Sequence, residues 1–121
     1  MICEHPFLGM GLGTFMDYSS AYAPLQGPSY AHNSYLQIGA ESGIFSLLSF
    51  LLFVGLILKK AVLKFRETSD GLILAVACAL IAFLVHGAVD TQFYSLKLSV
   101  LLWTMLGLLF GMSRMDHKGV A

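Results

Sequence analysis

The chain has 121 residues, of which 57% are hydrophobic and only 12% are charged. Soluble domains ordinarily carry about 25% charged residues, so this composition predicts an integral membrane protein. Seven basic residues balance seven acidic ones, which gives no electrostatic support for a nucleic-acid partner.

Residues 1–30 show no sustained helical period and are expected to form an irregular loop. They contain a Gly-x-Gly-x-Gly run at Gly9, Gly11 and Gly13, together with several aromatic residues. Such a run can bind phosphate, but it lacks the preceding strand that a dinucleotide site needs. The run therefore predicts a structural turn at the membrane surface, where the aromatic residues form an interfacial belt. The first residues also lack the basic and apolar stretches of a signal peptide.

Residues 31–60 begin with polar residues and continue into a long apolar run. We expect one helix from about Asn33 to the end of this segment, forming the first transmembrane span. At 100° per residue, Asn33, Gln37 and Glu41 stack on one face of that helix. Polar residues are costly inside a membrane and usually serve a purpose there, although a solvated helix start is also consistent with them.

A neighbouring face of the same helix carries His32, Gly39 and Gly43. The two glycines are expected to leave this face open to another helix or to a ligand. His32 and Glu41 differ by about half a turn around the helix axis. A direct bond between their side chains is therefore not expected within one straight helix.

The second half of the chain predicts two further spans. Its segments are, in order, a basic loop (61–70), a second span (71–89), a polar turn (90–97), and a third span with its tail (98–121). The second span is long enough, without its flanking residues, to cross about 30 Å of hydrocarbon. In the third span, Gly107 and Gly111 form a Gly-x3-Gly pair that is typical of helix packing in membranes.

The distribution of basic residues predicts the orientation in the membrane. Residues 1–43 contain no Lys or Arg, whereas residues 59–70 contain four of the seven and the tail contains two. By the positive-inside rule the basic connection and the C-terminus are cytoplasmic. His32 and the 90–97 turn then face the periplasm, and Lys97 there can extend its charge into the interface.

A second polar cluster lies at the end of the second span. His86 and Asp90 are four residues apart and share a helix face. They can serve helix packing and capping, or they can support a site. A metal site would draw on these residues together with His5, His32 and Glu41. However, no pair has the His-x3-His or Cys-x2-Cys spacing of metal ligands, so no metal is predicted.

The sequence AHNSYLQIGAESG resembles the signature of the O-antigen ligase and O-antigen polymerase family of bacterial membrane proteins. The matching positions are His32, Asn33, Tyr35, Leu36, Glu41 and Gly43. Upstream, His5 and Pro6 followed by the glycine run resemble the loop motif of the same family. The resemblance covers nearly the whole chain, but it corresponds only to the C-terminal part of a family member.

The resemblance implies an all-α integral membrane protein of the bacterial inner membrane, here with three transmembrane helices preceded by an irregular periplasmic loop. It also implies transfer of a glycan from an undecaprenyl-pyrophosphate carrier to an acceptor hydroxyl at the periplasmic face. For ligases the acceptor is the lipid A core, and for polymerases it is the growing carrier-linked glycan. The implied partners are these substrates, membrane lipid and the N-terminal helices of the family. No cofactor is implied.

Within this resemblance His32 is the candidate catalytic base, because a histidine can accept a hydroxyl proton near neutral pH. Asn33 and Tyr35 are candidates for positioning hydroxyls or the imidazole, and Glu41 and Asp90 for orienting neighbouring groups. The departing pyrophosphate needs cations, which family members supply from arginines in earlier helices and loops. We therefore expect this chain to be inactive by itself.

Two functions of other classes remain open. A transporter fragment would place polar residues along a path at mid-membrane depth, whereas here they cluster toward one face. A non-catalytic membrane scaffold or a gene remnant is also consistent with the sequence. The residues do not distinguish a ligase from a polymerase, nor do they identify the sugar.

Overall fold

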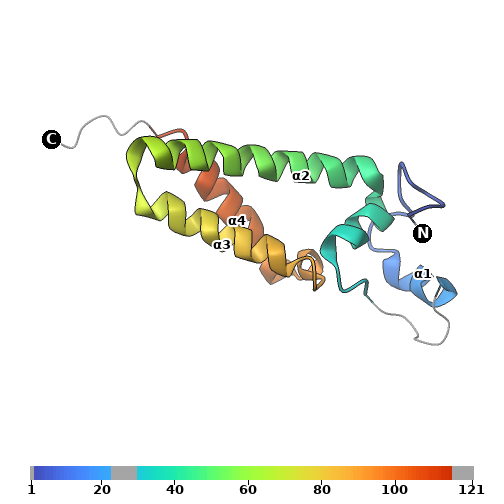
Figure 1. The fold of residues 1–121 in the computed structure, drawn as a ribbon. Helices are drawn as coiled ribbons and strands as arrows, with labels where there is room; N and C mark the ends of the chain where they lie inside the picture. Colours follow the sequence, from blue (N-terminus) through green and yellow to red (C-terminus); the bar gives the residue numbers. More distant parts are fainter. Residues whose placement is uncertain (1, 23–29, 116–121) are drawn as a thin grey trace.

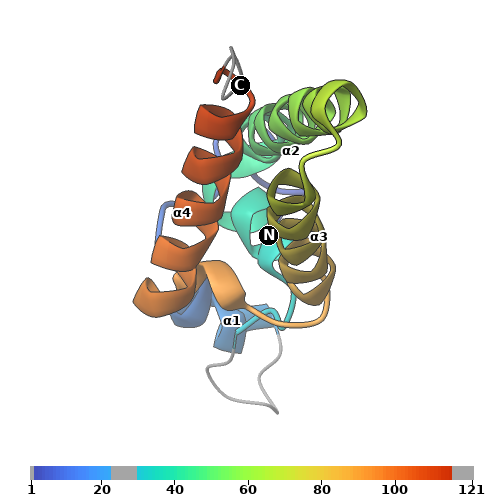
Figure 2. The ribbon, with the colours of Figure 1, turned by 90° about the vertical axis from the view of Figure 1, so that its left-hand side faces the viewer.

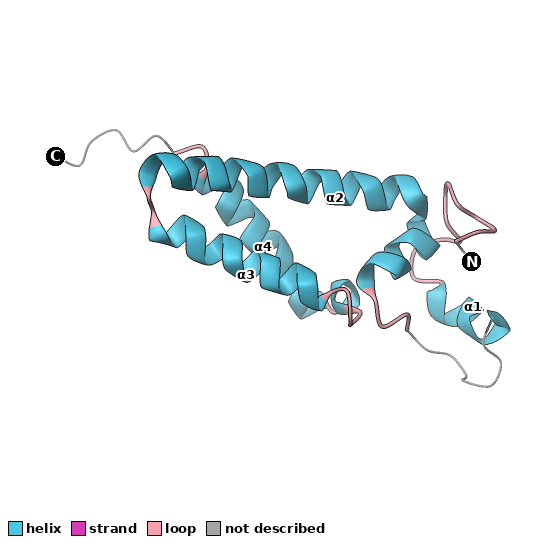
Figure 3. Cartoon of the chain, in the orientation of Figure 1, coloured by secondary structure: helices cyan, strands magenta, loops and turns pink. Residues whose placement is uncertain are grey.

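The computed structural model describes residues 2–22 and 30–115, and within these ranges the chain contains helices and loops but no strand (Figure 3). The elements are α1 (Phe15–Tyr22), α2 (Ser34–Thr68), α3 (Gly71–His86), the 3-10 helix η1 (Gln92–Tyr94) and α4 (Leu96–Met112). The all-helical prediction is therefore confirmed for the described part of the chain.

Helices α2, α3 and α4 lie side by side and form the body of the molecule (Figures 1 and 2). The chain runs along α2, returns along α3 and runs forward again along α4, so α2 and α4 are parallel (Figure 1). Helix α1 packs against the first turns of α2, near the connection between α3 and α4. We call this the motif end, and we call the opposite end, where α2 meets α3, the basic end.

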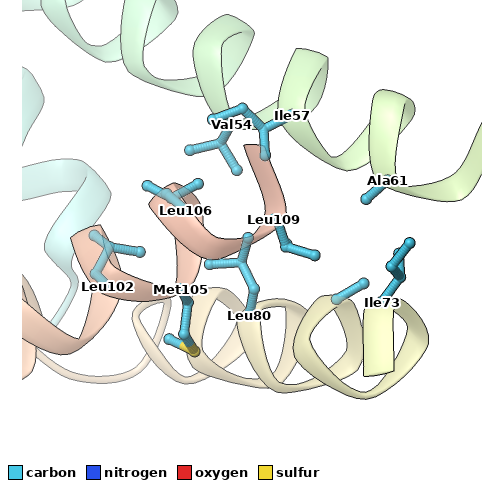
Figure 4. Packing of buried hydrophobic residues seen from close by; sticks show 10 residues of the cluster. Val54, Ile57, Ala61, Ile73, Leu80, Leu102, Met105, Leu106 and Leu109 are labelled. Carbon is cyan, nitrogen blue, oxygen red and sulfur yellow. The ribbon is translucent and has the colours of Figure 1, made fainter. Parts of the chain in front are cut away.

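The core is an apolar cluster to which all three long helices contribute (Figure 4). Its buried members are Val54, Ile57, Ala61, Ile73, Ala77, Leu80, Leu102, Met105, Leu106 and Leu109. They recur at intervals of three to four residues, which places them on one face of each helix. The outer faces are also rich in exposed Leu, Phe and Val, and helices that are apolar all round are typical of a membrane environment.

Among the described helices, α2 is the one that is both long and apolar enough to cross a membrane. Helices α3 and α4 are apolar but have 16 and 17 residues. At about 1.5 Å per residue each rises about 25 Å, which is less than the about 30 Å of a hydrocarbon core. One spanning helix is therefore supported by length and composition, and three spans stay a prediction.

The helix expected from about Asn33 to residue 60 does begin there, at Ser34 with Asn33 as its N-cap, but it differs from the expectation in two respects. The helix breaks at Gly43, which has φ 81° and ψ 173°. It then continues to Thr68, so the basic segment expected as a loop over 61–70 is almost entirely helical.

The break at Gly43 accommodates the glycine loop from the start of the chain. A Cβ added to Gly43 would lie 2.1 Å from the carbonyl oxygen of Phe7, and one added to Gly9 would lie 2.3 Å from the Glu41 carbonyl. The N–H of Gly11 donates to that same Glu41 carbonyl oxygen at 2.9 Å. The face that was expected to be open to another helix or to a ligand is therefore filled by the protein's own backbone.

Other boundaries also differ from expectation. Residues 1–30 were expected to be irregular, yet α1 forms over Phe15–Tyr22. Helix α3 ends at His86, and the 90–97 turn contains η1 and the start of α4. Gly107 and Gly111 are exposed with no atom within 4 Å of an added Cβ, so no described helix packs on this pair.

Candidate functional site

The start of α2 holds the connection between α3 and α4 through a set of hydrogen bonds at the motif end. Asn33 caps α2, because its Oδ1 accepts from the backbone N–H groups of Tyr35 at 3.0 Å and Leu36 at 2.9 Å. Its amide nitrogen also donates to the carbonyl of Ala88 at 2.8 Å. One asparagine therefore satisfies the helix terminus and anchors a segment 55 residues away.

Ser34 adds three bonds to the same connection, and Tyr35 adds one to the last turn of α3. The Ser34 hydroxyl donates to the Asp90 carbonyl at 2.8 Å and accepts from the Gln92 N–H at 2.9 Å, while its own N–H donates to the Gly87 carbonyl at 2.8 Å. The Tyr35 hydroxyl donates to the Leu84 carbonyl at 2.6 Å. Ser34 is fully buried. Sequence reasoning missed it, although a small hydroxyl residue between two polar motif positions was a signal for such a role.

Glu41 is the centre of a second set of bonds and is only 2% exposed. One carboxylate oxygen accepts from the Gly13 N–H at 2.8 Å and from the Tyr94 hydroxyl, and the other accepts from the Phe15 N–H at 3.2 Å and the Gln37 amide at 3.2 Å. All four partners are donors, which suits a group that only accepts. The first N–H group of α1, that of Phe15, finds its acceptor here, which favours a short helix in a segment without helical periodicity.

Tyr94 connects the Glu41 carboxylate to the 3-10 helix η1. Partial burial raises the pKa of the Tyr94 phenol well above its usual range, and the hydrogen bond to Glu41 and the charge of that carboxylate raise this pKa further. The phenol therefore stays protonated and donates at physiological pH. Sequence reasoning assigned no role to Tyr94.

His32 lies at the corner where the chain enters α2. Its backbone has φ 46°, in the left-handed region that few residues other than glycine adopt. The side chain is exposed and forms no hydrogen bond with another described residue. Unusual backbone conformations of this kind cluster at functional sites. His32 is therefore held in place through its neighbour Asn33 while its ring remains accessible.

His86 and Asp90 lie beside this corner. Their side chains are close to each other, as their four-residue spacing suggests, although α3 ends at His86 and Asp90 is in the turn that follows. The His86 Nε2 and the Asp90 Oδ2 are 4.0 Å apart, and both side chains are more than half exposed. The Asp90 Oδ1 accepts from the Thr91 N–H at 2.7 Å. The bond from Ser34 to the Asp90 carbonyl brings this turn against the segment that begins with His32.

A hollow of about 210 Å³ opens at the same end. It is lined by Tyr30, Thr91, Tyr94 and Ser95. Aromatic rings and hydroxyl groups together are a suitable lining for a sugar, because the rings contact its apolar face and the hydroxyl groups bond its hydroxyls. These four residues were missed from the sequence, since they come from two segments about 60 residues apart.

The structure thus divides the predicted site residues into two groups. Asn33, Tyr35 and Glu41 are committed to bonds within the protein, whereas the His32 and Asp90 side chains are exposed. Neither of these two lines the hollow, but each is close in sequence to a residue that does, Tyr30 and Thr91. In the part of the chain that is described, no three His, Cys, Asp or Glu side chains come together as a metal site.

Cations are scarce at the motif end. Lys97, in the first turn of α4, is the one Lys or Arg that the described residues place there. The other described cations lie on the last turns of α2 and just after α4, at the basic end.

Comparisons with protein-family models, with characterised proteins and with solved structures found no match to this chain.

Proposed function

We propose that the chain is the C-terminal part of a bacterial inner-membrane glycan transferase of the O-antigen ligase or polymerase type. The observation that carries this proposal is that His32 is exposed at the corner where α2 begins, two residues after Tyr30, which lines a hollow with another tyrosine and two hydroxyl residues. A base and a sugar-sized hollow lie at one end of an apolar bundle. This arrangement suits a reaction between membrane-anchored glycans.

In the proposed reaction His32 acts as the general base. The acceptor hydroxyl oxygen forms a bond to the anomeric carbon of the donor sugar while its proton passes to the His32 ring. The bond from that carbon to the pyrophosphate oxygen breaks, and undecaprenyl pyrophosphate leaves with the electron pair. Tyr94 and Thr91 contact the glycan in the hollow, and Asp90 orients the groups around His32.

Asn33, Tyr35 and Glu41 act indirectly in this proposal. Their bonds to the α3–α4 connection and to the glycine loop fix the corner that carries His32. A catalytic group displaced by about 1 Å can lose about a hundredfold in rate. These residues are therefore positioning residues, and the motif is at once structural and functional.

The leaving pyrophosphate requires more positive charge than the described residues place at the motif end, where Lys97 is the one Lys or Arg among them. We propose that preceding helices of a longer protein supply it. The isolated chain is then inactive, and glycan transfer by the purified 121-residue chain would contradict this part of the proposal.

We further propose that α3 and α4 cross the inner membrane beside α2, with the motif end periplasmic. Large apolar residues such as Leu72, Ile81 and Leu108 are exposed on their outer faces, and lipid is the solvent that suits them. Polar turns and caps extend both helices toward the interfaces, and the bilayer can thin locally around short spans.

The test is complementation by the complete gene in a strain that lacks it, with lipopolysaccharide analysed on a gel. His32→Ala is expected to abolish capped or extended chains while the protein still inserts. His86→Ala is the matched control, because His86 is another exposed histidine at the motif end to which the proposed reaction assigns no role. Loss of all capped chains indicates a ligase, and capping by single repeats indicates a polymerase.

A non-catalytic scaffold is the alternative that one observation favours, since Asn33, Tyr35 and Glu41 all have structural partners. The same experiment separates the two functions. A scaffold requires the fold but not the imidazole, so a normal ladder with inserted His32→Ala protein would reject the transferase proposal and support the scaffold.

A further inference from the structure

Two further hollows lie between the parallel helices α2 and α4, away from the motif end. One is apolar, has a volume of about 220 Å³ and is lined by Phe53, Ile57, Trp103, Leu106, Gly107 and Phe110. The other has a volume of about 350 Å³ and is lined by Lys60, Leu63, Lys64, Glu67, Ser113 and Arg114. We call these the apolar groove and the basic mouth.

The two hollows follow one another along the same pair of helices. The lining residues on α2 are Phe53, Ile57, Lys60 and Lys64, and the matching residues on and after α4 are Trp103, Gly107, Phe110 and Arg114. Both series have the same intervals of four, three and four residues, which keeps each on one helix face. Both run from an aromatic ring to a cation in the same direction.

Phe110 joins the groove to the mouth. The Lys60 Nζ lies 5.6 Å from the centroid of its ring, and the Arg114 guanidinium carbon lies 4.6 Å from it. Two like charges therefore converge on the rim of an apolar groove. At the other end of the groove, the Phe53 and Trp103 rings close it with their centroids 6.2 Å apart.

The charge around the mouth favours an anion. Five cations in the described chain belong to this end (Lys59, Lys60, Lys64, Arg66 and Arg114), against two carboxylates, Glu67 and Asp70. Glu67 is on the mouth itself, but its carboxylate lies 4.0 Å from Lys64 and is 70% exposed. Neither Lys60 nor Arg114 forms an ion pair with a described carboxylate, so their charge is available to a ligand.

We propose that the α2–α4 groove binds one anionic phospholipid, with its phosphate between Lys60 and Arg114 and an acyl chain along Gly107 toward Trp103. From Phe53 to Lys64 the helix rises about 16 Å, which matches the about 15 Å depth of one leaflet's hydrocarbon. Basic pockets between membrane helices are suited to lipid phosphates. The inference goes beyond glycan transfer and requires only that the bundle lie in a membrane.

The dimensions favour a lipid over a protein helix. A helix is about 10 Å across, so a helix 16 Å long would need on the order of 1,000 Å³, whereas the apolar groove has about 220 Å³. A single acyl chain is narrow enough for the groove. The basic mouth in addition matches the phosphate of a lipid rather than the uncharged middle of a membrane helix.

The fluorescence of Trp103 provides a direct test, because it is the chain's one tryptophan and lines the groove. The purified chain in detergent micelles is titrated with phosphatidylglycerol brominated on its acyl chains, which quenches nearby tryptophan. We expect half-quenching at about tenfold less lipid than with brominated phosphatidylcholine. The double variant Lys60→Gln and Arg114→Gln should raise the half-quenching point by about thirty-fold.

A matched pair of charges separates this site from general attraction to anionic lipid. Lys59→Gln with Arg66→Gln removes the same charge at the same end, from exposed residues that do not line the mouth. We expect this pair to shift half-quenching several-fold less than the pair at the mouth. Equal effects of the two pairs would overturn the proposal.

A matched pair of glycines tests the acyl chain. An added Cβ at Gly107 or Gly55 meets nothing within 4 Å, so both should accept leucine without strain, but only Gly107 lines the groove. Gly107→Leu should suppress quenching and Gly55→Leu should not; equal quenching of both variants would overturn the proposal.

Two other occupants of the groove would also contradict the proposal. Displacement of the lipid by millimolar inorganic phosphate would indicate a site for free phosphate. Conversion of a dimer to a monomer by Gly107→Leu would indicate that a second copy of the chain occupies the groove.

Discussion

The two ends of the bundle are built by different means. At the motif end, Ser34 and Glu41 are buried and each joins segments that are far apart in the chain. At the basic end the helices meet mainly through apolar side chains such as Ala61, Ile73 and Leu109. The first end is therefore fixed by directional bonds, and the second mainly by apolar packing.

This difference indicates where precise geometry matters. Apolar packing tolerates small shifts and volume-conserving changes, whereas a buried polar group that loses its partner carries the full cost of desolvation. The hydrogen bonds of the motif end hold the segment that carries His32 against the α3–α4 connection, which the proposed transfer requires. At the basic end, packing leaves hollows between α2 and α4, where we propose that a lipid binds.

The largest effect is expected where the glycine loop meets α2. Gly43→Ala places a Cβ 2.1 Å from the Phe7 carbonyl oxygen at a residue with φ 81°, so both the clash and the backbone strain oppose it. We expect a loss of about 3–5 kcal/mol in the free energy of unfolding, measured by SDS titration in mixed micelles with circular dichroism.

Gly55→Ala is the control for that change. Gly55 lies within α2, and an added Cβ meets no atom within 4 Å, so the substitution should be neutral or stabilise by about 0.5–1 kcal/mol. If Gly43→Ala were equally neutral, the loop would not be locked on the break of α2 and the contrast between the two ends would be lost.

The next largest effect is expected at the carboxylate that joins α1, α2 and η1. Glu41→Gln keeps the shape but turns one acceptor oxygen into a donor facing two other donors. We expect a loss of about 2–4 kcal/mol, with faster hydrogen exchange at the Gly13 and Phe15 amides. The exposed Glu67→Gln should change stability by no more than about 0.5 kcal/mol, and equal losses would contradict the central role of Glu41.

The helical class and the order of the three long helices could be read from the sequence, because apolar runs and caps are local signals. Asp70, for example, directly precedes an apolar run and caps α3, accepting from the Leu72 N–H at 2.8 Å. The break at Gly43 could not be predicted, since a glycine in an apolar helix is ordinarily helical. Its cause is the close approach of Phe7, which lies 36 positions earlier and is not a local signal.

The candidate site was predicted less completely. His32 and Asp90 were predicted to lie on the same side of the membrane, and the structure brings their segments together through Ser34. Tyr30, Thr91 and Tyr94 were missed, because a hollow forms only when distant segments meet. The hydrogen bond between Tyr94 and Glu41 could not be predicted either, since nothing in either local sequence specifies the partner.

A smaller effect is expected at the buried serine of the motif. Ser34→Ala removes a hydroxyl that donates to the Asp90 carbonyl and accepts from the Gln92 N–H, leaving two polar groups without their partner. We expect a loss of about 2 kcal/mol. Ser46 lies on the same helix, is exposed and bonds only to the Ser42 carbonyl, so Ser46→Ala should stay within about 0.5 kcal/mol. Equal losses would place the two serines in equivalent surroundings.

The smallest effect separates the ends by pH. Because burial, and then Glu41, raise the pKa of Tyr94 in the folded protein, its contribution to stability is complete below the ordinary tyrosine pKa of about 10. It is lost as the pH rises above that value, since the unfolded chain then ionises first. Tyr94→Phe should cost about 1 kcal/mol at pH 7 and should lose less further stability than wild type between pH 9 and 11. Tyr18→Phe, at an exposed tyrosine of α1, should follow the wild-type curve; an alkaline loss that is unchanged in Tyr94→Phe would show that the motif end does not depend on this phenol.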